Sequence, residues 1–234
     1  MKVVEDVTVE PRKWATPISI NPSRRPSLKE DSEQLIRRLL VSGDMRPGQL
    51  YSANSLASQL GISNSPVREA MLSLSAEGLL EPVRNRGFRV VEMTPKDRQE
   101  VYDLRRLIEV EAVRRAASRH LTKDEANTLT ELAHHALDLL PDTPGGDLIP
   151  YLDADNDFHC YLVGLIGNTR WSDMVRILRD QSRINGAYRH LGHQERDRAS
   201  AEEHIDIAHA VIRGDAVLAA DLMVRHLDYA RPQS

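Results

Sequence analysis

Three histidines and one aspartate in the C-terminal half have spacings that would let them bind one metal ion together. Asp155 and His159 are four residues apart, so on a helix they lie on one face, a turn from each other. His204 lies ten residues before Gly214, and His226 lies twelve after it. If two antiparallel helices meet at this glycine, the rise of about 1.5 Å per residue places both histidines at a similar level. Three imidazoles and one carboxylate suit zinc, nickel or manganese and leave positions for water or a ligand carboxylate.

The same spacing has a plainer interpretation. The chain contains nine histidines, so some regular spacings will arise by chance, and a lone histidine on a helix is more often a surface or core residue than a ligand. Adjacent His134 and His135 face different directions, and His209 is turned away from His204. From spacing alone, a metal site and an ordinary structural role both remain open.

A second group of residues, between positions 46 and 91, has the order of elements needed to read DNA. The pattern predicts a short helix over 54–60 that stops at Gly61, and a second helix over about 64–77 that Ser63 or Ser65 can cap. Pro66 lies in the first turn of that helix, where its missing N–H costs nothing. Alternating segments at 79–83 and 87–91 predict a two-stranded ribbon. Together these elements indicate a winged helix-turn-helix.

The second helix would present its exposed N-terminal side chains to base edges. Arg68 can pair with guanine and Asn64 with adenine, each through two hydrogen bonds. Arg84, Arg86 and Arg89 on the ribbon suit phosphates or the minor groove. Each arginine taken alone could equally be a solvated surface charge, but the ordered series of turn, proline and ribbon favours DNA. The residues that we expect to meet DNA are Ser63, Asn64, Ser65, Arg68, Arg84, Arg86 and Gly87.

Composition excludes several classes of protein. Hydrophobic content of 41% and charged content of 28% over 234 residues fit a folded globular chain of one large or two small domains. No apolar run approaches the roughly 20 residues that cross a bilayer, and acidic residues interrupt any signal peptide. The single cysteine, Cys160, forms no internal disulfide, which favours a reducing cytoplasm. The net charge is -4, so affinity for DNA would depend on local placement of basic residues and on dimerisation.

The chain divides into three segments. Residues 1–26 contain four prolines and little periodicity, which indicates a loosely ordered arm, although a strand or arm packed on the body is the alternative. Residues 27–93 hold the DNA-reading elements. From Thr94 onward everything favours helix, with expected spans of 95–119, 122–140, 148–166, 170–190, 196–213 and 215–230. The fold class is therefore mostly α: an N-terminal winged helix-turn-helix with a small β-ribbon, followed over 94–234 by an antiparallel bundle of about six helices.

The N-terminal pattern resembles the DNA-binding domain of the GntR family of bacterial transcription regulators over residues 28–93. The shared features are Pro47-Gly48, Leu-Ala-x-x-Leu-Gly-Ile-Ser over 56–63, Pro-Val-Arg-Glu-Ala over 66–70, Glu-Gly-Leu over 77–79 and the glycine at 87. The family often has arginine where this chain has Asn64, which leaves the operator sequence open, whereas Arg68 is retained.

Residues 95–230 resemble the helical effector domain of the FadR subfamily, called FCD. The matching residues include Leu-Arg-Arg-Leu-Ile-Glu over 104–109, Asp-x-x-Phe-His over 155–159, Glu-His at 203–204 and His-Leu at 226–227. In many such domains the corresponding aspartate and three histidines bind a divalent metal, and a small carboxylate completes the site. The resemblance thus implies a divalent metal at Asp155, His159, His204 and His226, with zinc expected first and nickel or manganese as alternatives.

The resemblance also favours Arg105 as the carboxylate partner of an effector, with Arg183 as a weaker candidate for that role. Arg105 is four residues before Glu109, so an ordinary ion pair within one helix is the alternative.

These observations predict a cytoplasmic homodimeric transcription regulator that reads a palindromic double-stranded DNA operator and responds to a small carboxylate effector. Repression is the commoner mode among relatives. One alternative is a metal sensor, in which the ion itself is the signal. A metal-dependent hydrolase is a weaker alternative, because the sequence has no general base beside the four ligands and no nucleophile motif. We therefore expect a regulator and not an enzyme, with no membrane partner.

Overall fold

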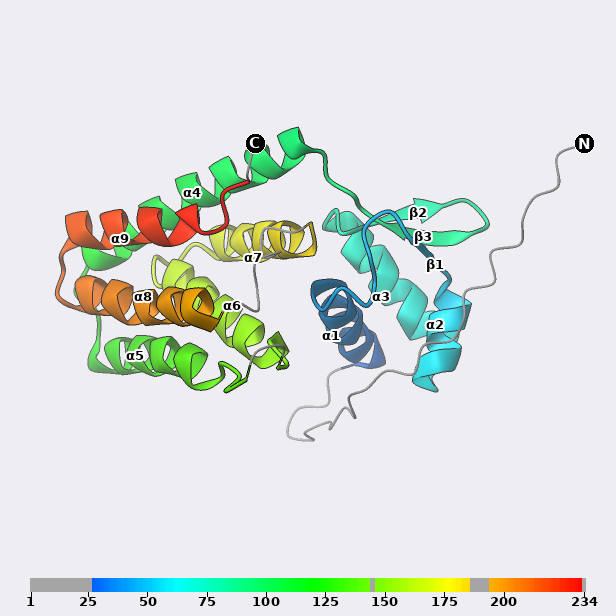
Figure 1. The fold of residues 1–234 in the computed structure, drawn as a ribbon, viewed down its shortest axis with the longest axis horizontal. Helices are drawn as coiled ribbons and strands as arrows, with labels where there is room; N and C mark the ends of the chain where they lie inside the picture. Colours follow the sequence, from blue (N-terminus) through cyan, green and yellow to red (C-terminus); the bar gives the residue numbers. More distant parts are fainter. Residues whose placement is uncertain (1–26, 144–145, 186–193, 233–234) are drawn as a thin grey trace, which may run out of the picture.

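The structure is a computed structural model that describes residues 27–143, 146–185 and 194–232 of the 234-residue chain. Within these residues the chain forms nine helices and three short strands, arranged as two halves (Figure 1). The N-terminal half combines three helices with the sheet, and the C-terminal half is a bundle of six helices. The arm predicted for residues 1–26 lies outside the described residues.

The N-terminal half has the order of a winged helix-turn-helix. Its elements are α1 (Leu28–Val41), β1 (Leu50–Tyr51), α2 (Ala53–Leu60), α3 (Asn64–Ala76), β2 (Leu80–Val83) and β3 (Gly87–Val90). The predicted ribbon is confirmed as β2 and β3, but the sheet has a third strand, because β1 pairs antiparallel with the other side of β3. A strand of two residues is too short to show an alternating pattern, which is why the sequence did not reveal it.

Apolar side chains from all three helices and the sheet form the core of this half. Ile36, Met71 and Leu74 are completely buried there, and Phe88 packs with them from β3. Ile184, from the C-terminal half, joins the same cluster. The core thus orients α3 with its polar side toward solvent and also ties the two halves together.

The loop between β2 and β3, here called the wing tip, consists of residues 84–86. Asn85 adopts a left-handed conformation with φ of 57°, which asparagine tolerates better than most residues. Gly87 has φ of 122°, and a Cβ at this position would lie 2.3 Å from the carbonyl oxygen of Tyr51. Only glycine allows this close approach of β1 to β3, so Gly87 positions the wing.

The C-terminal half confirms the predicted six-helix bundle. Its helices are α4 (Pro95–Ala117), α5 (Lys123–Asp138), α6 (Ile149–Gly164), α7 (Thr169–Ile184), α8 (Gln194–Ile212) and α9 (Ala216–Asp228). Capping boxes begin α4 at Thr94 and α5 at Thr122, as their sequences indicate. Helix α7 ends at Ile184, earlier than the predicted span to 190, and residues 186–190 lie outside the described part.

Helices α8 and α9 form the antiparallel hairpin expected at Gly214, which has φ of 76° (Figure 1). Helix α4 runs beside α9, and its Tyr102 hydroxyl donates to Asp228 near the far end of that helix. Phe158 and Leu162 of α6 fill the middle of the bundle. This packing brings α6, α8 and α9 around one interior point. No described helix is both long and apolar enough to cross a membrane.

Candidate metal centre and DNA-binding surface

The four side chains singled out as metal ligands come together inside the C-terminal half. Helix α6 supplies Asp155 and His159, α8 supplies His204, and α9 supplies His226. All four are buried, with exposed fractions of 0 to 6%. One potential ligand atom from each lies within 4.8 Å of the others. The one-turn spacing on α6, the hairpin at Gly214 and the packing of the bundle together build the cluster.

The distances within this cluster fit a set of neighbouring ligands around one ion. Nε2 of His159 lies 3.0 Å from Nε2 of His226. Oδ1 of Asp155 lies 3.2 Å from Nε2 of His204 and 3.7 Å from Nε2 of His159. Ligand atoms held about 2.0–2.2 Å from a common ion are separated by roughly 2.8–3.6 Å in octahedral or tetrahedral geometry, so two of the three distances lie in this range and the third is slightly longer. Three imidazole nitrogens and one carboxylate oxygen could therefore bind the same divalent cation.

His204 adds an independent reason to expect a cation. Its side chain is completely buried, and neither ring nitrogen makes a well-aligned hydrogen bond to the described residues. The 3.2 Å separation from Asp155 is a close contact without hydrogen-bond geometry. Buried polar atoms normally have a partner, because leaving one unpaired costs about 1–3 kcal/mol. A metal ion at the centre would supply that partner.

Two further carboxylates face the outer nitrogens of the histidines. Oε2 of Glu203 lies 2.9 Å from Nδ1 of His226 in a hydrogen bond. Oε2 of Glu109 lies 2.7 Å from Nδ1 of His159, a contact that is close but poorly aligned. A carboxylate at Nδ1 places the ring proton there and leaves the lone pair of Nε2 directed at the centre. The sequence did not indicate these roles for either glutamate.

Asp155 uses its two oxygens for different partners. Oδ1 faces the histidines, whereas Oδ2 accepts hydrogen bonds from Arg179 and Arg183 of α7. Arg179 also lies 3.2 Å from Oε2 of Glu109. The sequence did not indicate Arg179, although its spacing of four from Arg183 places both guanidinium groups on one side of α7.

These charges set the protonation states that metal binding requires. Burial alone would raise the pKa of Asp155, but the guanidinium groups of Arg179 and Arg183 outweigh it and hold the pKa well below its usual range. Burial lowers the pKa of His204 to about 4. Burial, reinforced by Arg179, also places the pKa of His159 well below its usual range. At neutral pH the aspartate is ionised and these two imidazoles are neutral, the forms that bind metals.

The two candidate effector-binding arginines lie beside the cluster. Arg105 is 2% exposed, and its Nε lies 2.8 Å from Oε1 of Glu109. Its Nη1 donates to the hydroxyl of Ser182 at 3.3 Å. Arg105 is therefore directed inward and also forms the ion pair within α4 that was the alternative. Arg183 reaches the same region through its bond to Asp155.

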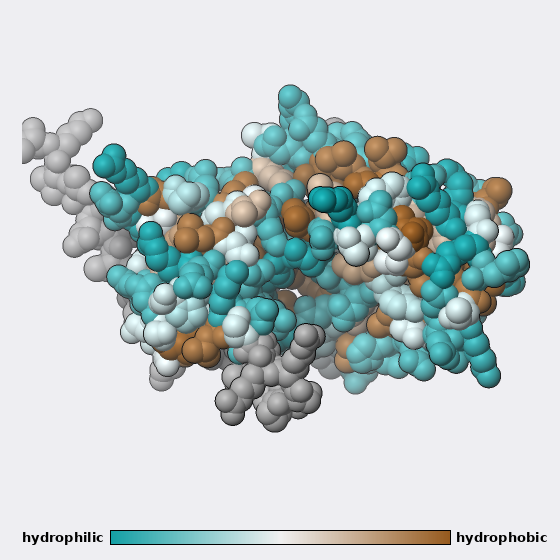
Figure 2. Space-filling model, turned by 180° about the vertical axis from the view of Figure 1, so that it is seen from behind, coloured by the Kyte–Doolittle hydropathy of each residue, from teal (hydrophilic) through white to brown (hydrophobic). Residues whose placement is uncertain are grey.

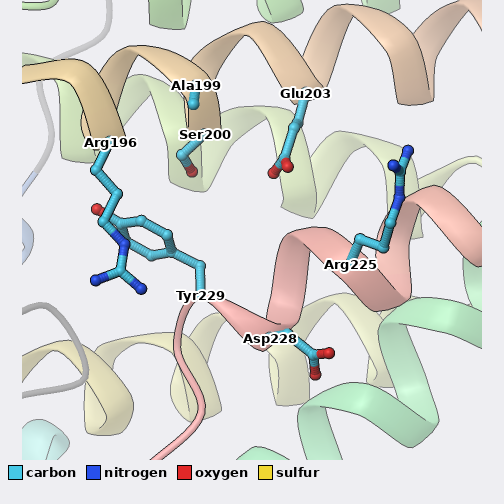
Figure 3. A pocket seen from close by; sticks show the side chains of 7 residues that line it. All are labelled: Arg196, Ala199, Ser200, Glu203, Arg225, Asp228 and Tyr229. Carbon is cyan, nitrogen blue, oxygen red and sulfur yellow. The ribbon is translucent and has the colours of Figure 1, made fainter.

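A surface pocket of about 290 Å³ lies between α8 and α9 (Figure 3). Its lining residues are Arg196, Ala199, Ser200, Glu203, Arg225, Asp228 and Tyr229. Glu203 points into the space between the two helices, and the same carboxylate binds Nδ1 of His226. Glu203, which binds Nδ1 of His226, is thus accessible from solvent, while His226 itself is buried.

The predicted DNA-contacting residues occupy the exposed side of the N-terminal half. Asn64, Ser65 and Arg68 are exposed on the first turns of α3. Ser63 is also exposed and lies at the N-cap position, but its side chain makes no capping hydrogen bond, and neither does Ser65 cap the helix as suggested. The hydroxyl of Ser65 donates instead to Glu69 at 3.2 Å.

The wing tip exposes Arg84 and Arg86. Arg89 lies opposite Glu81 on β2 and pairs with it at 2.7 Å, but its side chain is 43% exposed, so its contact with DNA stays a prediction. Its charge is therefore partly neutralised by the sheet itself. Gly87 is half-buried against β1, so its contribution to any DNA contact is to shape the wing.

An exposed reading helix with a basic wing, joined to a helical bundle that holds a buried cluster of histidines and an aspartate, defines a two-domain DNA-binding protein. Residues 28–90 match the domain described as bacterial regulatory proteins, gntR family, and residues 100–229 match the FCD domain. The chain therefore belongs to the GntR family of bacterial transcription regulators and carries an FCD effector domain. Its curated relatives are transcription regulators, which does not support the hydrolase alternative.

Two curated relatives illustrate the relationship. The Nta operon transcriptional regulator of Aminobacter aminovorans is 33% identical over 171 residues, covering 72% of this chain and 76% of the relative. The HTH-type transcriptional repressor GlaR of Escherichia coli K12 is 25% identical over 201 residues, covering 84% and 91%.

Solved structures show the same fold. McbR/YncC of E. coli superposes with a TM-score of 0.74 at 22% identity, covering 87% of this chain and 95% of the other. A putative GntR regulator from Rhodococcus sp. RHA1 gives a TM-score of 0.66 at 22% identity, covering 88% and 96%.

Proposed function

We propose that this protein is a homodimeric repressor whose affinity for a palindromic operator is controlled by a small organic acid bound at a divalent metal in the helical half. Residues 27–93 read the DNA, residues 94–234 sense the ligand, and the protein acts in the cytoplasm, where the chromosome is. The relative GlaR is named a repressor, which supports repression over activation.

The observation that carries the metal proposal is the convergence of four buried ligand atoms within 4.8 Å. The donor set of three imidazoles and one carboxylate favours zinc, with nickel and manganese as alternatives. Four protein ligands on an octahedral ion would leave two positions for an acid. A guanidinium has five N–H donors, so the contacts of Arg105 with Glu109 and Ser182 leave capacity for the carboxylate of an effector.

The DNA proposal rests on the exposed start of α3 and on the wing tip. Arg68 and Asn64 are placed to pair with bases in the major groove, while Arg84 and Arg86 are placed to contact phosphates or the minor groove. A single module of this size gives modest specificity, because one recognition helix reads few base pairs. Two copies related by a twofold axis would read two half-sites.

An apolar stripe on α4 supports the dimer. Leu104 and Leu107 lie three residues apart on one face of α4 and are 46% and 69% exposed, so together they form an apolar patch of the kind found at interfaces. Figure 2 shows apolar residues gathered along the upper edge of the helical half, where Figure 1 places α4 and α9. We assign this stripe to the contact with a second copy.

The direct test uses the purified full-length protein, its metal content measured by mass spectrometry, and its operator selected from random duplexes. We expect about one divalent ion per chain and an operator affinity that falls when a small carboxylate is added at constant metal. His226→Ala should lose the metal and the response to the acid while still binding the operator. His209→Ala, an exposed histidine on α8, is the matched control.

The outcomes separate the candidate functions. A response to metal alone, with no effect of any carboxylate, would favour the metal-sensor alternative. Retention of metal by His226→Ala would contradict the assignment of the site.

A further inference from the structure

One helix, α7, contacts both the metal cluster and the DNA-binding half. Arg179 and Arg183 of α7 donate to Oδ2 of Asp155. Arg176 and Asp180, on the neighbouring stripe of the same helix, form ion pairs with the DNA-binding half. Residues three and four apart on a helix lie side by side. The two sets of contacts therefore share one rigid element and must move together.

The ion pairs at this interface form a connected network. Glu77, at the end of α3, lies 2.6 Å from Nη2 of Arg176 through Oε1 and 2.8 Å from Nη2 of Arg37 through Oε2. Arg37 of α1 also donates to Asp180 of α7. The side chains of Arg37, Glu77 and Asp180 are only 18%, 13% and 3% exposed. Solvent screening is weak at such sites, so these pairs hold the helices in a fixed relation.

Uncharged contacts anchor the same end of α7. The side-chain amide of Gln181 donates to the carbonyl of Glu77 at 2.9 Å, and the backbone N–H of Met93 donates to Asn185 at 2.8 Å. Ile184 packs into the core of the DNA-binding half. In Figure 1 the end of α7 faces α1 and α3 directly. The C-terminal end of α7 therefore belongs to the DNA-binding half as much as to the bundle.

We propose that α7 transmits occupancy of the metal centre to the DNA-binding half, with Asp155 as the link. This inference rests on the metal site proposed above. Oδ1 of Asp155 faces the centre, and Oδ2 binds α7. A cation held by Oδ1 would withdraw negative charge from Oδ2 and so would weaken the attraction of Asp155 for Arg179 and Arg183. The resulting shift of α7 reaches α1 and α3 through Arg176, Asp180 and Ile184.

Hydrogen–deuterium exchange with Zn²⁺ as the only added ligand tests this route without knowledge of the effector or the operator. In the wild-type full chain, zinc should slow amide exchange in α6, α8 and α9. It should also change exchange in α1 and at the end of α3 by about fivefold or more, the lower range of typical coupling between sites. Arg176→Ala should keep the effect near the cluster and weaken the effect at the end of α3, where Arg176 binds Glu77, while α1 still responds through the pair of Asp180 with Arg37.

Two properties make Arg176→Ala a selective variant. Its side chain is 33% exposed and does not touch the cluster, and Glu77 keeps its bond to Arg37 when Arg176 is removed. We therefore expect a folded protein with unchanged zinc affinity by calorimetry. Arg170→Ala, an exposed arginine on the same helix with no ion pair to the described residues, is the matched control and should behave as wild type.

The outcomes distinguish this inference from the proposal on which it rests. If zinc has no effect on α6, α8 and α9, the metal site itself is wrong, and this inference falls with it. If zinc protects those helices but leaves α1 and α3 unchanged in the wild type, transmission through α7 is wrong while the site stands. An effect at the end of α3 that is as large in Arg176→Ala as in the wild type would also overturn the route through Arg176.

Discussion

Asp155 and Arg179 are joined through a single carboxylate oxygen, Oδ2, while the other oxygen of Asp155 faces three imidazoles. Asp155 is therefore both a candidate ligand and the contact between α6 and α7. Its pKa is held well below the usual range, because Arg179 and Arg183 outweigh the effect of burial. Asp155 is therefore ionised even without a metal, so an incoming ion does not have to displace a proton from it.

Glu203→Gln should weaken metal binding while leaving the fold intact. The carboxylate accepts from Nδ1 of His226, and its loss removes the group that directs Nε2 at the centre. Loss of such an outer partner typically costs about 10- to 100-fold in metal affinity. Calorimetric titration with Zn²⁺ measures the change, and the neighbouring, exposed Glu202→Gln is the control. Equal affinity in both variants would remove Glu203 from the site.

Arg68→Ala and Arg86→Ala should affect DNA binding in different ways. Arg68 is placed to read a base, so its loss should cost about 1–3 kcal/mol of discrimination at one position of each half-site. Arg86 is placed at the wing tip and should weaken binding to all sequences, with a reduced dependence on salt. Competition between operator variants at two salt concentrations separates the two effects. An identical specificity profile for wild type and Arg68→Ala would argue against base reading by this residue.

Leu107→Glu should convert the dimer to a folded monomer. The side chain is 69% exposed on α4, so the carboxylate is tolerated in the isolated chain but would be desolvated against a second copy. Light scattering after gel filtration gives the mass of each species. Leu72→Glu makes the same change at a 46% exposed leucine of α3 and should leave the dimer in place. A dimeric Leu107→Glu would place the interface elsewhere.

The charge of Glu77 should make the free energy of unfolding depend on pH in the acid range but not near pH 7. Burial would raise the pKa of Glu77, but the guanidinium groups of Arg176 and Arg37 outweigh it and lower the pKa from the ordinary value of 4.5. A lowered folded-state pKa means that the ionised form stabilises the fold above that ordinary value. This contribution is lost as the pH falls through the lowered pKa.

Thermal unfolding at a series of pH values checks this prediction. The difference in melting temperature between wild type and Glu77→Gln should be largest near pH 7 and shrink below about pH 4. Glu131→Gln, at an exposed glutamate of α5, should show a small difference with no such trend. A constant difference for Glu77→Gln across this range would contradict the role of its charge.

The sequence predicted what depends on local geometry. The spacing of Asp155 and His159 places both on one helical face, and the glycine at 214 sets the level of His204 and His226. Capping at Thr94 and Thr122 follows in the same way from four-residue patterns, which end at Asp97 and Glu125. These features were predictable because each depends on one helix or on one turn.

Features that depend on packing between distant elements were not predictable from the sequence. The bond of Arg179 to Asp155 joins α7 to α6, and the contact of Glu109 with His159 joins α4 to α6. Arg89 was expected to contact phosphates, but its partner Glu81 became evident only from the register of β2 and β3. The periodicity of a sequence does not show how one helix is rotated against another. The spacing of four between Arg179 and Arg183 is equally typical of an exposed helix surface.

The shared network of Arg37, Glu77 and Asp180 has a consequence for protein engineering. A chimeric regulator joins the DNA-binding domain of one protein to the effector domain of another, and such a design treats the junction as a linker with no specific contacts. In this protein the last turn of α3 and the middle of α1 carry charges that are matched to α7. A transplanted module that lacks these partners would leave Asp180 buried without its counter-ion, so a working hybrid has to import the matching residues along with the reading helix.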